Sequence, residues 1–328
     1  MSNMNLSSKI SQMFSTARIY CLISIVSAHL IFPNTYAADF LSRLGTVGVV
    51  LFLIISGYFF RPQNFDNFWS LVKKKARTIC IPWFTLGSIT WMYNAFLSNH
   101  FRSVTGYINW ILGNKTYLYY MPVLLVCFLV FYKAPKAVLF TAIPLNVCSI
   151  ILTATGVLDS VVSSLGITHY LNVFNWIGFF ALGMLLQLAD SEKIYAFFKK
   201  FRFLAISLFV IAFVLLLIFR NIRFDYFSYV AIPYELIGGA AILSLSTFSL
   251  TKYRVFKKLS NYSFAIFLIH MIFIGLFDSI LAKTIVTMFL SPIIIIGIVF
   301  VCFWLVEWLS GKAKLGKVYQ LLVGIRNN

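Results

Sequence analysis

Acidic residues and charge in general are scarce in this sequence. Its 328 residues include 9 Asp and Glu against 27 Lys and Arg, and charged residues make up 11% of the chain. In soluble globular domains about a quarter of residues are charged, so an ordinary soluble fold is excluded. Cysteine and histidine are also few. The 5 cysteines form no close pair, and no His, Asp, Glu or Cys spacing is typical of a metal site. We therefore expect neither a disulfide framework nor a metal.

Hydrophobic residues make up 61% of the chain and recur in runs near the ~20 residues that span a bilayer as a helix. Alternating ten-residue segments of a membrane barrel do not appear. The pattern predicts an all-α polytopic membrane protein of one domain over residues 1–328, with no fused soluble domain. A cytoplasmic segment is expected at 1–16 and a cytoplasmic tail at 310–328. The expected spans are about ten, near residues 17–34, 44–60, 79–97, 117–132, 137–154, 169–188, 203–220, 228–248, 263–282 and 286–309.

The distribution of positive charge predicts the orientation of these spans. A formal net charge of +18 would suggest nucleic acid as the partner of a soluble protein. With the N-terminus inside, however, most of the 27 Lys and Arg fall on one side of the membrane, and the exceptions are Arg43, Arg102, Lys115, Arg220, Arg223 and Lys283. The positive-inside rule makes the basic side cytoplasmic, so both termini are expected there and no nucleic acid is implied. Membrane lipid headgroups are the natural partners of this basic rim.

Two polar residues stand out in the first expected span, "TARIYCLISIVSAHLIFP". Arg18 and His29 are eleven residues apart, which places them about 20° apart on one helix face and about 16 Å apart along the axis. Taken by itself, Arg18 is explained by a long side chain that extends to the lipid headgroups on the cytoplasmic side of the membrane. His29 is better interpreted as functional, because a neutral imidazole accepts a proton near neutral pH and ionisable groups inside membranes mark functional sites.

Further candidates lie along the chain. Ser56 and Gly57 break the second apolar run, where a small residue lets a ligand or another helix approach the backbone. Lys74 and Arg77, in "KKKARTICIPW", form a basic cluster that suits either phosphate groups or anionic lipid. Glu235, in "IPYELIGGA", is a carboxylate well inside a span and is expected to pair with a cation or to share the site.

Four other ionisable residues are interpreted more cautiously. His270, in "NYSFAIFLIHM", is a second candidate imidazole, for which an interhelical hydrogen bond is the competing interpretation. His100 and His169 fall at the outer boundary and are expected to be solvated. Glu307, near the inner end of the last span, is expected to be a surface partner for the basic tail.

Five segments together resemble the acyltransferase-3 family of bacterial membrane acyltransferases. "ARIYCLISIVSAH" resembles its first-helix motif of arginine, ten residues and histidine, and "GVVLFLIISGYFF" its second-helix Ser-Gly-Phe signature. "YLYYMPVLLVCFL" is similar to its fourth helix, with Tyr119 in place of tryptophan. "FNWIGFFALGMLL" and "LSNYSFAIFLIHM" resemble two later segments. The matches occur in the same order over nearly the whole chain.

The resemblance implies transfer of an acyl group, usually acetyl from cytoplasmic acetyl-CoA, to a sugar hydroxyl of a surface glycan such as lipopolysaccharide O-antigen. It implies a bacterial cytoplasmic membrane protein in which His29 and Arg18 are essential. Family members often carry an Arg-x-x-Arg pair, where this chain has Lys74-Lys75-Ala76-Arg77, so the bidentate fork of one arginine is lost. Any partner protein for the outer step would be separate.

A transfer mechanism across the bundle predicts one continuous polar cavity that touches Arg18 and His29 and opens beside Lys74 and Arg77. His29 would take the hydroxyl proton, in direct transfer or through an acyl intermediate. The competing hypothesis is a flippase or exporter of a lipid-linked sugar, with His29 and Glu235 as a proton relay. An acyltransferase leaves an ester on the glycan, whereas a flippase moves its cargo unchanged.

Overall fold

The computed structural model of the protein describes residues 6–30, 32, 35–97, 103–219, 224–278, 280 and 284–325. Among these residues the regular elements are all helices and none is a strand, which confirms the all-α class. The α-helices are α1 (Leu6–Ala28), α2 (Thr35–Phe59), α3 (Phe68–Lys75), α4 (Ile81–Leu97), α5 (Val104–Ile111), α6 (Tyr120–Val130), α7 (Lys136–Ala154), α8 (Asp159–Ser164), α9 (Ile177–Leu188), α10 (Ser191–Lys200), α11 (Arg202–Ile218), α12 (Ala231–Leu245), α13 (Arg254–Asp278), α14 (Ile285–Lys312) and α15 (Gly316–Val323).

Single turns of tighter or wider helix connect several of these elements. The π-helical turn η2 (Ala76–Cys80) joins α3 to α4. The 3-10 turns are η1 (Pro62–Asn64), η3 (Tyr117–Tyr119), η4 (His169–Leu171), η5 (Val173–Asn175), η6 (Ser246–Phe248) and η7 (Leu250–Lys252).

Several helices are long and apolar enough to cross a membrane. In the described part of the chain these are Lys9–Ala28, Tyr36–Phe59, Lys136–Ala154, Ala231–Lys252, Arg254–Phe277 and Val286–Lys312. A seventh candidate is the pair α10 and α11, bent by 60°, and two apolar helices, Tyr117–Val130 and Ile177–Leu188, are shorter. The protein is therefore a multi-pass membrane protein. Each of the ten expected ranges overlaps a helix, but the total of ten spans and the side on which the termini lie stay predictions.

The helices extend beyond the expected spans at both ends of the chain. Part of the segment expected at 1–16 belongs to α1, which begins at Leu6. This part packs into the bundle: the side chains of Met13 and Phe14 are completely buried, and Phe14 stacks on Tyr58 at 4.2 Å between ring centroids. In the expected tail, α15 packs against α4, with Tyr319 and Val323 buried. Burial of these apolar side chains away from lipid or water stabilises both terminal segments against the bundle.

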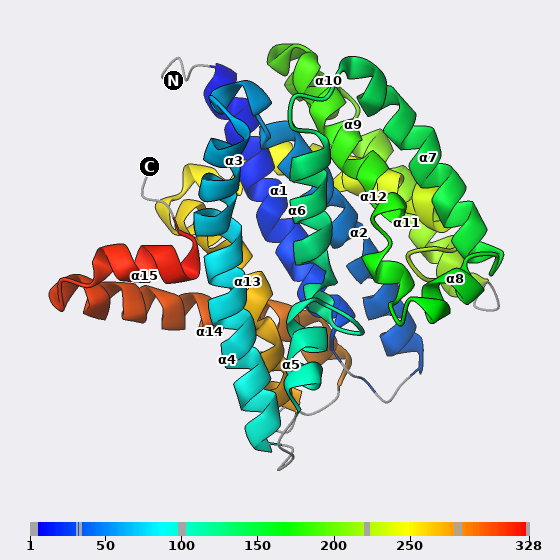
Figure 1. Ribbon diagram of the computed structural model, residues 1–328. Coiled ribbons are helices and arrows are strands. Elements are labelled where there is room, and N and C mark those ends of the chain that lie inside the picture. The colour runs from blue at the N-terminus through cyan, green and yellow to red at the C-terminus, as the bar shows by residue number, and fades with distance from the viewer. Residues whose placement is uncertain are drawn as a thin grey trace.

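The core of the bundle is built around α1. Figure 1 shows α1 running through the middle of the molecule, with α3 and α10 near one end and α5 and α8 near the other. The helix packs against α2 and α13, and α2 packs in turn against α9. A polar contact joins the first two helices, since the buried Ser24 hydroxyl donates to Leu44 O at 2.6 Å and accepts from Gly48 N–H at 3.0 Å. Such polar contacts stabilise helix pairs in membranes.

The α2–α9 contact depends on two glycines. A Cβ atom added at Gly57 would lie 2.0 Å from Phe180 O, and one added at Gly183 would lie 2.0 Å from Ile54 O. Each glycine thus allows the backbone of the other helix to approach, which is the small-residue packing common between membrane helices. Gly57 therefore serves the contact between helices, one of the two interpretations of the Ser-Gly pair.

Candidate active site

A first cavity, here called the Arg18 cavity, lies toward the end of the bundle that carries α3. Its volume is about 330 Å³. It is bounded by α1, α2, the turn η2, α6, α13 and the residue that follows α15. Its lining mixes polar and apolar side chains: Arg18, Ile25, Phe52, Ser56, Thr78, Ile79, Tyr120, Leu124, Phe128, Ser260, Asn261, Ser263, Phe264, Phe267 and Gly324.

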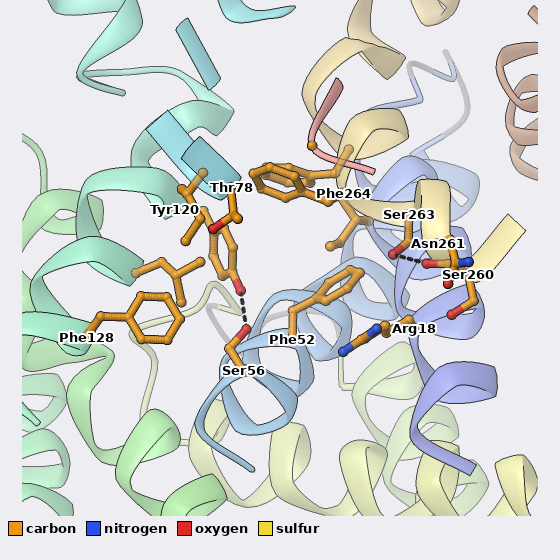
Figure 2. A pocket seen from close by; sticks show the side chains of 15 residues that line it. Arg18, Phe52, Ser56, Thr78, Tyr120, Phe128, Ser260, Asn261, Ser263 and Phe264 are labelled. Atoms are coloured by element: carbon orange, nitrogen blue, oxygen red, sulfur yellow. Dashed lines mark hydrogen bonds between the residues drawn. The ribbon is translucent and has the colours of Figure 1, made fainter. Parts of the chain in front are cut away.

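The guanidinium of Arg18 is the cationic group of this cavity. Figure 2 shows it extending from α1 toward Phe52 and Ser56, with Tyr120 on the far side. Arg18 is half-buried and lies 5.0 Å from the ring centroid of Phe59. Among the described residues no carboxylate lies within salt-bridge distance of it. Its fork of N–H donors suits a phosphate group of a bound ligand.

A second cavity, the His29 cavity, lies further along α1 and is larger, about 1030 Å³. It is lined by α1 and α2, the α5–α6 connection, η4 and the segment before α12. The residues around it are largely aromatic and polar: Ile25, Ala28, His29, Ser42, Thr46, Val49, Trp110, Lys115, Thr116, Tyr117, Tyr119, Tyr120, Asp159, Val162, Ser163, Ile167, Thr168, His169, Tyr170, Phe224, Asp225, Tyr226, Phe227, Phe267 and Met271.

His29 stands at the end of α1 rather than within it. The helix ends at Ala28, and His29 occupies the turn that follows, where its N–H contacts Val26 O at 3.2 Å. The span expected at 17–34 therefore ends six residues too late, and His29, expected inside the helix, lies one residue beyond its end. The ring is half-buried and faces the second cavity.

A second imidazole and a phenol pack against His29. Ring centroids lie 5.2 Å apart between His29 and His270, and 6.1 Å apart between His29 and Tyr117. His270 is completely buried, and its Nδ1 lies 2.6 Å from Phe267 O. A carbonyl oxygen only accepts, so Nδ1 carries the hydrogen and Nε2 carries the lone pair. Among the described residues that Nε2 has no hydrogen-bond partner. The bond to Phe267 O is within α13, so the expected interhelical hydrogen bond is not what His270 makes.

Three described residues line both cavities: Ile25 from α1, Tyr120 from α6 and Phe267 from α13. All three are buried. Neither of these two cavities is lined by both Arg18 and His29, so the single continuous cavity predicted from the sequence is not found in the described residues, and the two cavities meet at a common wall instead. The predicted alignment of Arg18 and His29 on one helix places one residue in each cavity.

The family model Acyl_transf_3, described as an acyltransferase domain, matches residues 14–308. The chain belongs to the acyltransferase-3 family. No curated protein and no solved structure matches the chain. The match runs from Phe14 in α1 to Trp308 in α14, so it includes every lining residue of the two cavities of this membrane acyltransferase except Gly324.

The basic cluster of the acyltransferase lies beside the Arg18 cavity but not in its lining. Lys74 and Arg77 are exposed, and the Nζ of Lys74 lies 4.8 Å from the ring centroid of Phe65. The next two residues, Thr78 and Ile79, do line the cavity, and they belong to the π-helical turn. Such turns are frequent at functional sites. The cavity thus adjoins the cluster as predicted, whereas contact of these two cations with a donor stays a prediction.

Ser56 and Gly57 differ in position although they are neighbours in sequence. Ser56 lines the Arg18 cavity, and its Oγ lies 3.4 Å from the hydroxyl of Tyr120 (Figure 2). Gly57 lines neither cavity and faces α9, as described above. The position of Ser56 suits the predicted donor site, whereas that of Gly57 is explained by helix packing.

Glu235 and Tyr119 differ in their relation to the His29 cavity. Tyr119 lines the cavity and stacks on Trp176 at 5.4 Å between ring centroids. Glu235, on α12, is completely buried, and neither carboxylate oxygen has a hydrogen-bond partner among the described residues. No cation is paired with Glu235 among the described residues, and Glu235 lines neither cavity. Neither of the two roles expected for Glu235 is therefore found in the described structure.

The remaining ionisable candidates have local partners. His169 is half-buried, not fully solvated, and its Nε2 lies 2.8 Å from Asp159 Oδ1 in the wall of the His29 cavity. Glu307 pairs with Lys258 at 2.6 Å and accepts a hydrogen bond from Tyr262 at 2.8 Å. Its partner is thus on α13 rather than in the tail. His100 lies outside the described residues. No group of three or more His, Cys, Asp or Glu in the described part of the chain is placed to hold a metal.

Proposed function

We propose that this membrane acyltransferase moves an acetyl group from acetyl-CoA to a sugar hydroxyl of a bacterial cell-surface glycan, such as lipopolysaccharide O-antigen or another exopolysaccharide. The protein would reside in the cytoplasmic membrane. The donor would bind at the end of the bundle that carries α3. The observation that carries this proposal is the placement of Arg18 and His29 in two adjoining cavities along one helix. A phosphate-binding cation and a proton acceptor thus lie on opposite sides of one wall.

The Arg18 cavity suits the donor. CoA carries phosphates that cannot enter the hydrocarbon region, and Arg18 offers a bidentate partner for one of them. The exposed Lys74 and Arg77 adjoin the cavity through the next residues of the turn and would attract the donor by charge. Phe52 and Phe264 in the same lining offer apolar contacts to the uncharged pantetheine arm.

The His29 cavity suits the acceptor. Its volume of about 1030 Å³ has room for more than one sugar ring. Tyr119, Tyr170 and Tyr226 line it and offer flat surfaces to the apolar faces of sugar rings. The carboxylates of Asp159 and Asp225 also line it, and carboxylate oxygens accept hydrogen bonds from hydroxyl groups.

The reaction proposed at the wall is acyl transfer from sulfur to oxygen. The sugar hydroxyl attacks the thioester carbonyl, the new C–O bond forms, the C–S bond breaks, and the hydroxyl proton passes to His29. The proton then passes to the CoA thiolate, which leaves as the thiol. An acyl group carried first by the protein would use the same imidazole. The Nε2 of His270 has no hydrogen-bond partner in the described structure, although the ring packs against His29. A hydrogen bond that forms from His29 to this lone pair when the substrates bind would hold the His29 ring in the tautomer that acts as a base.

The test uses the purified full-length protein in sealed vesicles. Acetyl-CoA is supplied on one face and a lipid-linked glycan is confined to the other, and ester formation and free CoA are measured. We expect acetyl-glycan only when acetyl-CoA faces the end that carries α3. Transfer that requires donor and acceptor on the same face would overturn the through-membrane part of the proposal.

The same vesicles test the flippase hypothesis. A flippase would move the lipid-linked glycan across the bilayer without any gain in mass and without release of CoA. Mass spectrometry of the glycan, from cells with and without the protein, should show the additional mass of one acetyl group if the proposed function is right.

A further inference from the structure

The wall between the two cavities is made by one side chain from each of three helices. Ile25, Tyr120 and Phe267 are exposed by only 2%, 6% and 5%, so they are closely packed. Along α1, Ile25 lies seven residues after Arg18 and four before His29, which puts the three side chains within about 40° of one face. The rise of the helix places Ile25 about 10 Å from Arg18 and about 6 Å from His29. The straight path between the two functional groups therefore passes Ile25.

We propose that Ile25, Tyr120 and Phe267 form an aperture that selects narrow, unbranched acyl groups for transfer. This inference rests on the proposed function, since it concerns the acyl group that such a donor carries. The carbonyl carbon reaches His29 only after the acyl end of the donor has passed the three side chains. An unbranched acyl group is no wider than the pantetheine arm that follows it through the aperture, whereas a branched or aromatic acyl group must displace packed side chains.

Tyr120 is the side chain best placed to move. Its hydroxyl contacts Ser56 Oγ at 3.4 Å, a long and hence weak hydrogen bond (Figure 2). It is also the first residue of α6, directly after the 3-10 turn η3, where the helical hydrogen-bond pattern changes.

The other two sides of the aperture are stiff. Ile25 is β-branched and therefore restricted in χ1 within a helix. The ring of Phe267 is held by Tyr117 and His270 at 5.9 Å between ring centroids in each case. The size of these two side chains then sets the width of the opening.

The experiment measures kcat/KM for acetyl-, butyryl-, isobutyryl- and benzoyl-CoA with the reconstituted full-length protein. Ile25→Ala and Phe267→Leu should each raise the ratio of benzoyl to acetyl transfer by on the order of tenfold or more, since each methylene that finds room changes discrimination by about tenfold or more. Ile19→Ala is the matched control: Ile19 is buried on the same helix and lines neither cavity. That variant should keep the wild-type profile.

Two outcomes would overturn the inference, and they are distinguishable. If no acyl-CoA supports transfer by the wild type, the proposed function fails and the aperture fails with it. If the wild type transfers acetyl but the preference for unbranched over branched and aromatic acyl groups is unchanged in Ile25→Ala and Phe267→Leu, the aperture alone is wrong. Ile25→Val, which removes one methyl group, gives an intermediate shift in the profile and serves if the alanine variant does not fold.

Discussion

The imidazole rings of His29 and His270 lie 5.2 Å apart between centroids, with their planes inclined at 48°. They come from the end of α1 and the middle of α13, and one of them is tied through Nδ1 to a backbone carbonyl. That tie leaves His270 as a hydrogen-bond acceptor toward its surroundings, so the two rings have different chemical roles. The first faces a cavity, and the second is completely buried behind it.

The first prediction concerns the proton acceptor. His29→Ala and His29→Gln should lower kcat for acyl transfer by about 10²- to 10⁴-fold, the usual contribution of a positioned general base. Protein abundance in the membrane should stay close to that of the wild type, because His29 lies beyond the end of α1 and its ring is only half-buried. Normal glycan acetylation at matched protein level would remove His29 from the mechanism.

The second prediction separates positioning from packing at His270. His270→Leu should lower kcat roughly ten- to hundredfold with little change in KM for either substrate, as expected when an outer partner of a reacting imidazole is lost. His270→Gln keeps a hydrogen-bond acceptor and should recover part of that rate. Equal losses in both variants would point to a packing role only.

The third prediction concerns Arg18. Arg18→Gln should lower kcat/KM for the donor roughly ten- to hundredfold, since hydrogen bonds to charged groups contribute about 1.5–3 kcal/mol. Arg18→Lys keeps the charge but loses the planar fork, so it should recover only part of the loss. KM for the acceptor should change little. Direct titration of the protein with CoA gives a second measurement, in which Arg18→Gln should weaken binding.

The fourth prediction tests the exposed basic cluster. The double variant Lys74→Gln, Arg77→Gln should raise KM for the donor severalfold, and the effect should shrink as ionic strength rises because exposed charges are screened. Lys136→Gln is the control, because Lys136 is an exposed cation that lines neither cavity. If donor and acceptor KM rise equally, the cluster serves lipid contact alone.

The fifth prediction concerns stability. Gly57→Ala should destabilise the protein by about 1–3 kcal/mol or more, because the new Cβ would overlap Phe180 O and force the helices apart. Thermal unfolding in detergent measures the loss. Gly239→Ala is the matched control, since Gly239 is also buried within a helix but its added Cβ would meet only Leu51 Cδ1 at 3.8 Å. That control should keep or slightly raise the unfolding temperature. Equal behaviour of the two variants would contradict the packing argument.

The sequence predicted the features that depend on a single helix. The helical class follows from the length of the apolar runs, and the common face of Arg18 and His29 follows from the eleven residues between them. Both properties are local, so composition and spacing are enough to predict them. The π-helical turn after Lys75, where the basic cluster meets the next apolar run, was not predicted.

Features that depend on how helices meet were not predicted. The role of Gly57 in the contact with α9 needs Phe180, which lies far along the chain. The common wall needs Tyr120 and Phe267 on two helices whose packing against α1 no periodicity specifies. Ile25 alone had a signal in the sequence, because its spacing of seven and four residues from Arg18 and His29 puts it on their face.

The reciprocal glycine contact between α2 and α9 also limits which parts of the protein can rearrange during turnover. Two backbones in direct contact leave no side chains between them that could change rotamer, so this pair is expected to behave as a fixed frame. Any movement that opens the wall between the cavities is then expected in α6, which is short and begins at Tyr120, directly after the 3-10 turn η3. Amide hydrogen exchange should accordingly be slowest around Ile54 and Gly183 and faster at the start of α6.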